Sequence, residues 1–240
     1  TQMIKKLIVL ASAALLSGCV TSTTQFENEM PVGTVLTDRV ITPQGDVLLP
    51  PGEWTVIGKD LFRNNSYHPF GQVALAKIAD NNELDGLVVY TTALESHANY
   101  GFVATGACDA TDDDLYHQKS ANQELGTQAC LSVSDLNVSL NNAIEGHLIQ
   151  AANYLDVHEV DKPTTMLFSK YRVVRRNKLL MVQYGFNYRQ PIGEVIPGFT
   201  PVDKFNYSRP FGTELWKSNL ETVIAWSKEK EDLIRSTFLD

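Results

Sequence analysis

Five histidines and a short run of aspartates are the side chains in this sequence best suited to hydrolytic or metal chemistry. No two histidines stand three or four residues apart, so the helical zinc motif H-E-x-x-H cannot form. His117 follows Asp112, Asp113 and Asp114 and could act as a general base beside one of these carboxylates. The aspartates do not complete a calcium loop, because Thr111 and Asp114 occupy its third and sixth positions. Hydrolysis by a dispersed His/carboxylate site stays open, and we expect no bound metal.

Nucleophile-elbow and phosphate-binding motifs are missing from the chain. The closest glycines are five residues apart, which excludes both G-x-S-x-G and G-x-G-x-x-G. Gly101 and Gly106 have the spacing of a phosphate-binding loop, but Ala107 and Cys108 replace its Lys and Ser/Thr. We therefore expect no cofactor and assign no catalytic residue.

The N-terminal segment has the organisation of an export signal. Lys5 and Lys6 precede an apolar run from Leu7 to Leu16, which has the length of a signal-peptide core. A helix that spans a bilayer needs about 20 apolar residues, so this run is too short to span one. We expect residues 1–18 to be a signal peptide.

The apolar run ends in Leu16-Ser17-Gly18-Cys19. Together with the basic start and the apolar core, this ending resembles the lipobox of bacterial lipoproteins. The resemblance implies cleavage before Cys19, a diacylglyceryl group on its sulfur and an acyl chain on its new amine. Several acyl chains give stable membrane attachment. Val20 follows where inner-membrane lipoproteins carry Asp, which favours the outer membrane, facing the periplasm.

The remaining cysteines, Cys108 and Cys130, form an even pair in a chain that we expect to be exported. Export leads into an oxidising compartment, where such a pair forms a disulfide. Closing a loop of this size stabilises the fold by about 3 kcal/mol in the chain-entropy model. No C-x-x-C motif or histidine-rich spacing supports a metal or redox role.

Composition indicates a globular, acidic body. The chain has 240 residues, of which 43% are apolar and 20% are charged, and its formal charge is −8. Sequence-independent nucleic-acid binding needs clustered Lys and Arg, so we expect no nucleic acid as a partner. Residues 19–31 contain a Ser/Thr-rich stretch without apolar periodicity, which we interpret as the lipidated cysteine and a flexible tether. The mature body resembles no family that its residues identify.

Hydrophobic periodicity predicts strands followed by a helix, a hairpin and a second helix. The expected strands are 54–62, 72–79, 87–94, 131–138, 165–174 and 179–188. The helices are expected over 140–155, with Ile144 and His147 on its apolar face, and over 213–238. No strand–helix–strand series repeats, so a doubly wound parallel sheet is excluded. We predict one α+β domain over 32–240, in which an antiparallel sheet carries both helices on one face; a β-sandwich with added helices is the alternative.

The segment 185–212 repeats the pattern F-N-Y-x-x-P-x-G. It provides Tyr188, Arg189, Phe205, Tyr207 and Arg209, residue types that contribute much of the energy of protein interfaces. Aromatic rings also stack on sugars. The alternative is that the aromatic residues of this region belong to the core.

A basic hairpin stands out against the acidic background. Arg172, Arg175 and Arg176 lie there between Lys170 and Lys178. Such a cluster could hold an anion, such as a lipid headgroup, a phosphate or an acidic partner. A solvated turn that prevents edge pairing is the alternative.

These observations favour a non-catalytic module that is tethered to the membrane and binds an envelope protein, a glycan or another envelope component. An envelope hydrolase built around His117 is one alternative. A carrier that holds an apolar ligand in a closed cavity is another. The sequence does not define an oligomeric state.

Overall fold

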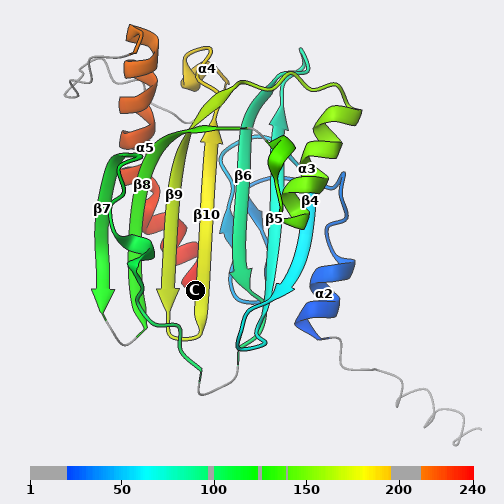
Figure 1. Ribbon diagram of the computed structural model, residues 1–240, viewed down its shortest axis with the longest axis vertical. Coiled ribbons are helices and arrows are strands. Elements are labelled where there is room, and N and C mark those ends of the chain that lie inside the picture. The colour runs from blue at the N-terminus through cyan, green and yellow to red at the C-terminus, as the bar shows by residue number, and fades with distance from the viewer. Residues whose placement is uncertain (1–20, 97–99, 124–125, 139, 196–211) are drawn as a thin grey trace, which may run out of the picture.

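One eight-stranded antiparallel sheet forms the centre of the structure, a computed structural model that describes residues 21–96, 100–123, 126–138, 140–195 and 212–240 (Figure 1). In spatial order its strands are β1 (Val35–Leu36), β4 (Trp54–Arg63), β5 (Pro69–Ile78), β6 (Leu84–Ala93), β10 (Lys178–Phe186), β9 (Thr165–Arg175), β8 (Thr127–Asn137) and β7 (Asp114–Gln123). A small second sheet pairs β2 (Arg39–Val40) with β3 (Val47–Leu48).

The described helices are α2 (Ser22–Asn28), α3 (Gly146–Val157), the single turn α4 (Ile192–Val195) and α5 (Glu214–Leu239). Short 3-10 turns are η1 (Gly106–Cys108) and η2 (Leu140–Asn142).

The large sheet consists of two antiparallel meanders that meet edge to edge. β4, β5 and β6 form the first, and β7, β8, β9 and β10 form the second. β10 joins them by pairing with β6, from Leu180 opposite Thr92 to Phe186 opposite Gly86. The predicted antiparallel sheet with accompanying helices is therefore confirmed. The eight strands form one sheet, unlike the two packed sheets of the sandwich alternative.

Helix α5 covers the back face of the sheet and is seen behind β8 and β9 in Figure 1. Trp226 packs edge-on against Tyr184 and Phe186, with ring centroids 5.4 and 5.2 Å apart. Thr213 caps the helix, since its hydroxyl accepts a hydrogen bond from the backbone N–H of Trp216 at 3.1 Å. The helix predicted over 213–238 is thus confirmed almost to the residue.

Helix α3 covers the opposite, front face of the sheet, over β4 and β5 (Figure 1). Its buried side presents His147, Ala151 and Leu155. A Cβ on Gly58 of β4 would lie 1.9 Å from the carbonyl oxygen of His147, so this close approach requires glycine. His147 is buried in the interface, as predicted, although within the described residues its Nδ1 has no hydrogen-bond partner.

The prediction that both helices pack on one face is wrong, because α3 and α5 lie on opposite faces. The reason lies in the strands, which are apolar on both sides at one end. On β9, Met166 and Phe168 belong to the cluster beneath α3, whereas Leu167 belongs to the cluster beneath α5. Two apolar faces both need a covering layer.

The helix predicted over 140–155 begins later than expected, at Gly146. Leu140–Asn142 form η2 instead, and Ile144, which we expected on the buried face, is 88% exposed. Asparagine is a weak helix former because its side chain competes for backbone hydrogen bonds, and two of the three residues of this turn are asparagines.

Two elements do not follow from apolar periodicity. Strand β7 occupies part of the acidic segment between the cysteines, and its register shifts twice where it pairs with β8. Helix α2 lies within the segment 19–31 that we expected to be a flexible tether. Thr21 caps α2, and Phe26 is 3% exposed and packs against Gly71 of β5. That part of the segment is therefore docked on the body.

Candidate functional site

Two rows of side chains cross the front face of the sheet, and we call them the polar rows because Arg172, Lys170, Ser132 and Gln183 lie in them. Both rows follow the register of β8, β9 and β10. They are Cys130–Arg172–Met181 and, two residues along each strand, Ser132–Lys170–Gln183. Met181 and Gln183 are exposed, whereas Leu180 and Val182, which point to the back face, are buried. Strand alternation therefore divides β10 into a core side and a solvent side.

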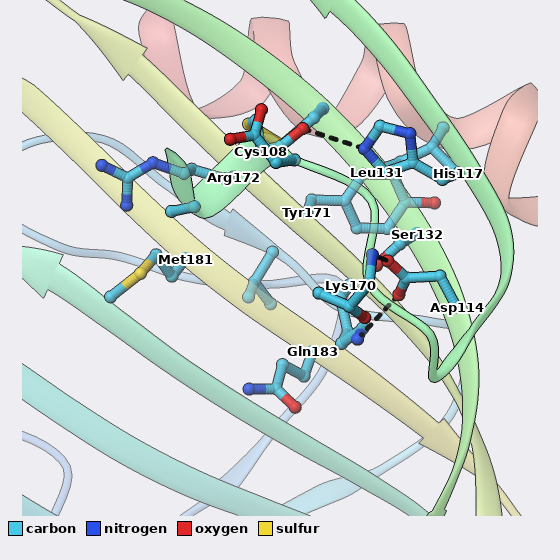
Figure 2. Close-up of a pocket in the computed structure, with 15 residues that line it drawn as sticks. Cys108, Asp114, His117, Leu131, Ser132, Lys170, Tyr171, Arg172, Met181 and Gln183 are labelled. Atoms are coloured by element: carbon cyan, nitrogen blue, oxygen red, sulfur yellow. Dashed lines mark hydrogen bonds and ion pairs between the residues drawn. A yellow bond between two sulfur atoms is a disulfide. The ribbon is translucent and has the colours of Figure 1, made fainter. Parts of the chain in front are cut away.

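The polar rows lie between two covered apolar regions. At one end Tyr100 and Phe102 pack with Val174 and Leu179, and at the other end α3 covers the sheet. A cleft of about 200 Å³ remains between them, which we call the front cleft (Figure 2). Its lining residues are Ala107, Cys108, Asp109, Thr111, Asp114, His117, Cys130, Leu131, Ser132, Lys170, Tyr171, Arg172, Met181, Val182 and Gln183.

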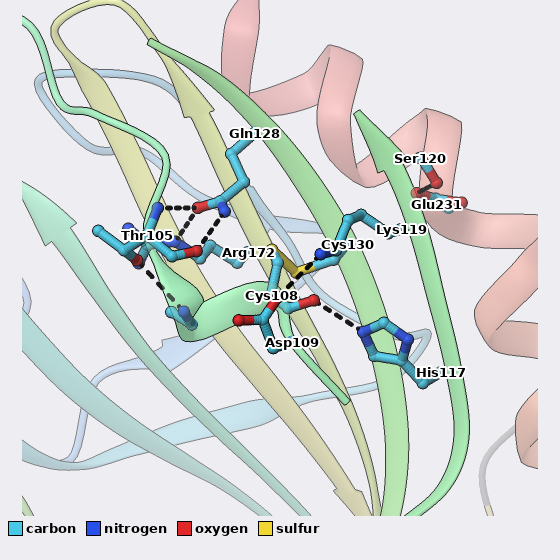
Figure 3. Close-up of a disulfide and its surroundings, with 11 residues drawn as sticks. Thr105, Cys108, Asp109, His117, Lys119, Ser120, Gln128, Cys130, Arg172 and Glu231 are labelled. Atoms are coloured by element: carbon cyan, nitrogen blue, oxygen red, sulfur yellow. Dashed lines mark hydrogen bonds and ion pairs between the residues drawn. A yellow bond between two sulfur atoms is a disulfide. The ribbon is translucent and has the colours of Figure 1, made fainter. Parts of the chain in front are cut away.

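One wall of the front cleft is the segment 105–111, which we call the strap. The predicted disulfide is confirmed: Cys108 of the strap is bonded to Cys130 of β8, with Cα atoms 5.8 Å apart (Figure 3). His117 of β7 donates from Nε2 to the carbonyl oxygen of Cys108 at 2.9 Å. Lys119 Nζ lies 2.9 Å from the carboxylate of Asp109. The strap is thus held to β7 and β8 by a covalent bond, a hydrogen bond and an ion pair.

Arg172 is the central cation of the front cleft. Its Nε donates to Gln128 Oε1 at 2.8 Å, and Gln128 Nε2 donates to the carbonyl oxygen of Thr105 at 2.7 Å (Figure 3). This relay fixes the guanidinium between β9 and the strap. Burial lowers the pKa of Arg172, and among the described residues no carboxylate lies within ion-pair distance of it. Within the part of the chain that the structure describes, the guanidinium is therefore a half-buried charge without a counter-charge.

The other charges of the front cleft are matched. Lys170 Nζ lies 3.2 Å from the carboxylate of Asp114. Asp114 also accepts from the backbone N–H of Thr111 at 2.9 Å. Burial acts to raise the pKa of Asp114, but these two partners and Ser132 outweigh it and lower the pKa to about 2. The carboxylate of Asp114 thus stays charged at neutral pH and pairs with Lys170.

Only one of the three arginines predicted on the basic hairpin lies in the front cleft. Arg172 points into it, while Arg175 and Arg176 are exposed at the β9–β10 turn. Arg176 adopts a positive φ of 55°, and its backbone bonds to Gly126 and Phe102. The cluster that was contiguous in sequence is therefore divided between a turn and a sheet face.

The predicted aromatic site is divided as well. Phe205, Tyr207 and Arg209 lie outside the described residues. Tyr184 and Phe186 are buried beneath α5, in agreement with the core alternative. They therefore offer no surface to a partner.

Tyr188 and Arg189 are occupied by contacts within the chain. The hydroxyl of Tyr188 bonds to Thr165 and lies 3.3 Å from Asp135. Arg189 pairs with Glu83 at 2.9 Å and with Asp161 at 2.6 Å. Arg189 thereby links the β5–β6 turn to the segment between α3 and β9.

The hydrolase alternative does not gain a catalytic pair from this geometry. His117 and Asp114 both line the front cleft, but His117 bonds to a backbone carbonyl and Asp114 bonds to Lys170. Ser227 and Lys230 have S-x-x-K spacing on α5, yet Ser227 is buried and Lys230 pairs with Glu229. Within the described ranges no three His, Cys, Asp or Glu residues gather as a metal site.

Gln128, Met181 and Gln183 are site residues that sequence reasoning did not select. A signal was present in β9, where Lys170 and Arg172 alternate with Ser169, Tyr171 and Val173. That alternation indicates one polar and one apolar face. Identifying the cleft also requires the pairing of β9 with β8 and β10 and the position of the strap.

Comparison of the chain with protein-family models, with curated proteins and with solved structures found no match. Across the described residues, no helix has both the length and the apolar character needed to cross a bilayer.

Proposed function

We propose that this chain is an envelope lipoprotein, anchored to the outer membrane through Cys19 and facing the periplasm, whose body is a non-catalytic binding module. The basic, apolar and cysteine-containing N-terminal segment supports the anchor. The Cys108–Cys130 disulfide supports an oxidising compartment. The front cleft is the proposed binding site, and its ligand is an envelope protein or another envelope component.

The front cleft is the observation that carries the binding role. Two polar rows are left open on a sheet whose apolar ends are covered, and the disulfide fixes the adjoining wall. Sites built on strands and supported by neighbouring hydrogen bonds hold their geometry well. The cleft offers donors and a charge but no activated nucleophile, which favours binding over catalysis.

The anchor is tested by intact mass spectrometry of the full-length protein extracted from membranes. We expect loss of residues 1–18, the added mass of acyl chains on Cys19, and two hydrogens fewer for the disulfide. Cys19→Ser is the control, and it should yield a chain without acyl chains. A wild-type chain without acyl chains would contradict the anchor.

The binding role is tested by native mass spectrometry of the same extract in mild detergent. We expect a molecule that co-purifies with the wild-type protein and is lost from Met181→Trp, which fills the front cleft. Leu233→Trp is the matched control, because Leu233 is also exposed but lies on α5. Equal retention by all three proteins would place the ligand elsewhere and contradict the assignment of the cleft.

A further inference from the structure

We propose that the front cleft binds a free carboxylate group, held by the guanidinium of Arg172, on a ligand of about the size of one amino acid. The inference deepens the proposed function by naming the chemical class of the ligand. It does not depend on the lipid anchor, because it uses only the body of the chain.

The orientation of Arg172 carries the first step. Its Nε is engaged by Gln128, and neither terminal nitrogen has a hydrogen bond to any described residue. An arginine engaged through Nε presents its terminal N–H groups in one direction, as a planar fork that matches a carboxylate. Burying half of a positive charge costs free energy unless an anion pairs with it.

The charge balance of the cleft carries the second step. Lys170 is neutralised by Asp114, and Lys119 is neutralised by Asp109. One positive charge, that of Arg172, is left over. It matches the single negative charge of a carboxylate, whereas a phosphate group carries a charge of about −1.5 to −2 at neutral pH and would leave part of it uncompensated.

The remaining lining defines the rest of the ligand. Met181, the register partner of Arg172, gives an exposed apolar surface beside the guanidinium. Ser132 and Gln183 lie in the neighbouring row, two residues further along their strands than Cys130 and Met181, and they provide polar groups. The volume of about 200 Å³ admits a small acid with a short apolar side chain and an amide, but not a large lipid.

The first experiment is isothermal titration calorimetry of the full-length protein in non-ionic detergent, with N-acetylalanine as the probe. We expect a dissociation constant on the order of 1 mM, and weakening by at least about tenfold in Arg172→Gln. Arg175→Gln is the matched control, since it removes the same charge from an exposed position three residues away and should leave binding within about twofold. Equal weakening in both variants would overturn the proposal.

The second experiment supplies the carboxylate from the protein itself. Met181→Glu places a carboxylate opposite Arg172 on the neighbouring strand, where opposite charges attract. We expect it to abolish N-acetylalanine binding and to raise the melting temperature by roughly 1–3 °C. Met181→Gln introduces a side chain of the same size as glutamate but without the charge. It should neither abolish N-acetylalanine binding nor raise the melting temperature. This pair leaves Arg172 and its contact with Gln128 in place, so it remains decisive if Arg172→Gln folds poorly.

The results separate this inference from the proposed function. Inorganic phosphate that binds more tightly than N-acetylalanine, and through Arg172, would overturn the choice of carboxylate. Loss of anion binding alone, with a ligand still displaced by Met181→Trp, would overturn the carboxylate and leave the binding module intact. If neither anion binding nor a ligand displaced by Met181→Trp is found, both the carboxylate inference and the proposed binding function are contradicted.

Discussion

The two faces of β9 show how one strand serves both stability and binding. Tyr171 on the back face donates its hydroxyl to the carbonyl oxygen of Ser227 in α5 and is buried. Arg172, the next residue, faces the front cleft and has no carboxylate partner among the described residues. Because successive side chains point to opposite faces, a rigid core residue holds each cleft residue from below. The packing of the back face therefore holds the side chains of the front face in position.

The difference between the faces lies in what covers them. The back face beneath α5 contains an aromatic cluster of Tyr171, Tyr184, Phe186 and Trp226. The front face is covered only at its apolar ends, and polar side chains occupy the gap. The gap is the part of the front face that stays open to a ligand, which is why the proposed binding site lies there.

The sharpest test of the comparison is Trp226→Ala against Met181→Ala. Trp226 fills the back core, so its removal should lower the free energy of unfolding by about 3–5 kcal/mol. Met181 is 38% exposed on the front face, so its removal should cost less than about 1 kcal/mol. Urea unfolding followed by circular dichroism measures both. Similar losses would mean that the front face is part of the core.

The next largest effect is expected from the disulfide. The double variant Cys108→Ser, Cys130→Ser should lose about 3 kcal/mol of unfolding free energy, because the unfolded chain regains the entropy of the closed loop. It should also bind N-acetylalanine less tightly, since the strap is released. Thermal unfolding with and without a reducing agent provides the check. Only the wild-type protein should respond to the reducing agent.

Asp114→Asn should lower stability by about 1–2 kcal/mol at neutral pH. The folded pKa of Asp114, about 2, lies below its ordinary value of 3.8, so its stabilisation is complete above pH 3.8 and is lost as the pH falls through 2. Urea unfolding between pH 2 and pH 7 measures this. The variant should lose less stability than the wild type over the acid range, and parallel curves would contradict the assignment.

The smallest effect is expected at Arg189, which lies away from both faces. The Arg189 side chain is 42% exposed in its ion pairs with Glu83 and Asp161, so Arg189→Gln should cost less than about 1 kcal/mol. The pKa of Glu83, which is lowered by hydrogen bonding to Asn187 and then by Arg189, should rise in the variant. NMR titration of the Glu83 carboxyl carbon detects this rise. If Arg189→Gln reduces ligand binding, Arg189 belongs to the binding site after all.

The hairpins and the long C-terminal helix could be predicted because their signals are local. The polar turn 175–178 and the apolar alternation on either side define β9 and β10 in the sequence itself. Thr213 and the spacing of Leu220, Val223 and Ser227 similarly define α5. In these segments local preference and tertiary packing agree.

The placement of α3 and the front cleft could not be predicted because both depend on contacts that are distant in sequence. A bulge in β4 between Val56 and Gly58 changes which residues face the front, and no periodicity reveals it. The relay from Arg172 through Gln128 to Thr105 joins three segments that only the fold brings together. The sequence therefore predicts Arg172 as a member of a basic, anion-binding cluster, but not the cleft that surrounds it.

If Cys19 is the proposed lipid anchor, the docking of α2 limits how far the body can stand from a bilayer. Phe26 holds this helix on the sheet, and α2 begins at Ser22. With acyl chains on Cys19, only two residues, Val20 and Thr21, separate the anchor from the first residue of α2, a span of at most about 10 Å. The body of the protein would then lie close to the membrane surface. A ligand of the proposed lipoprotein would then have to be met close to that surface.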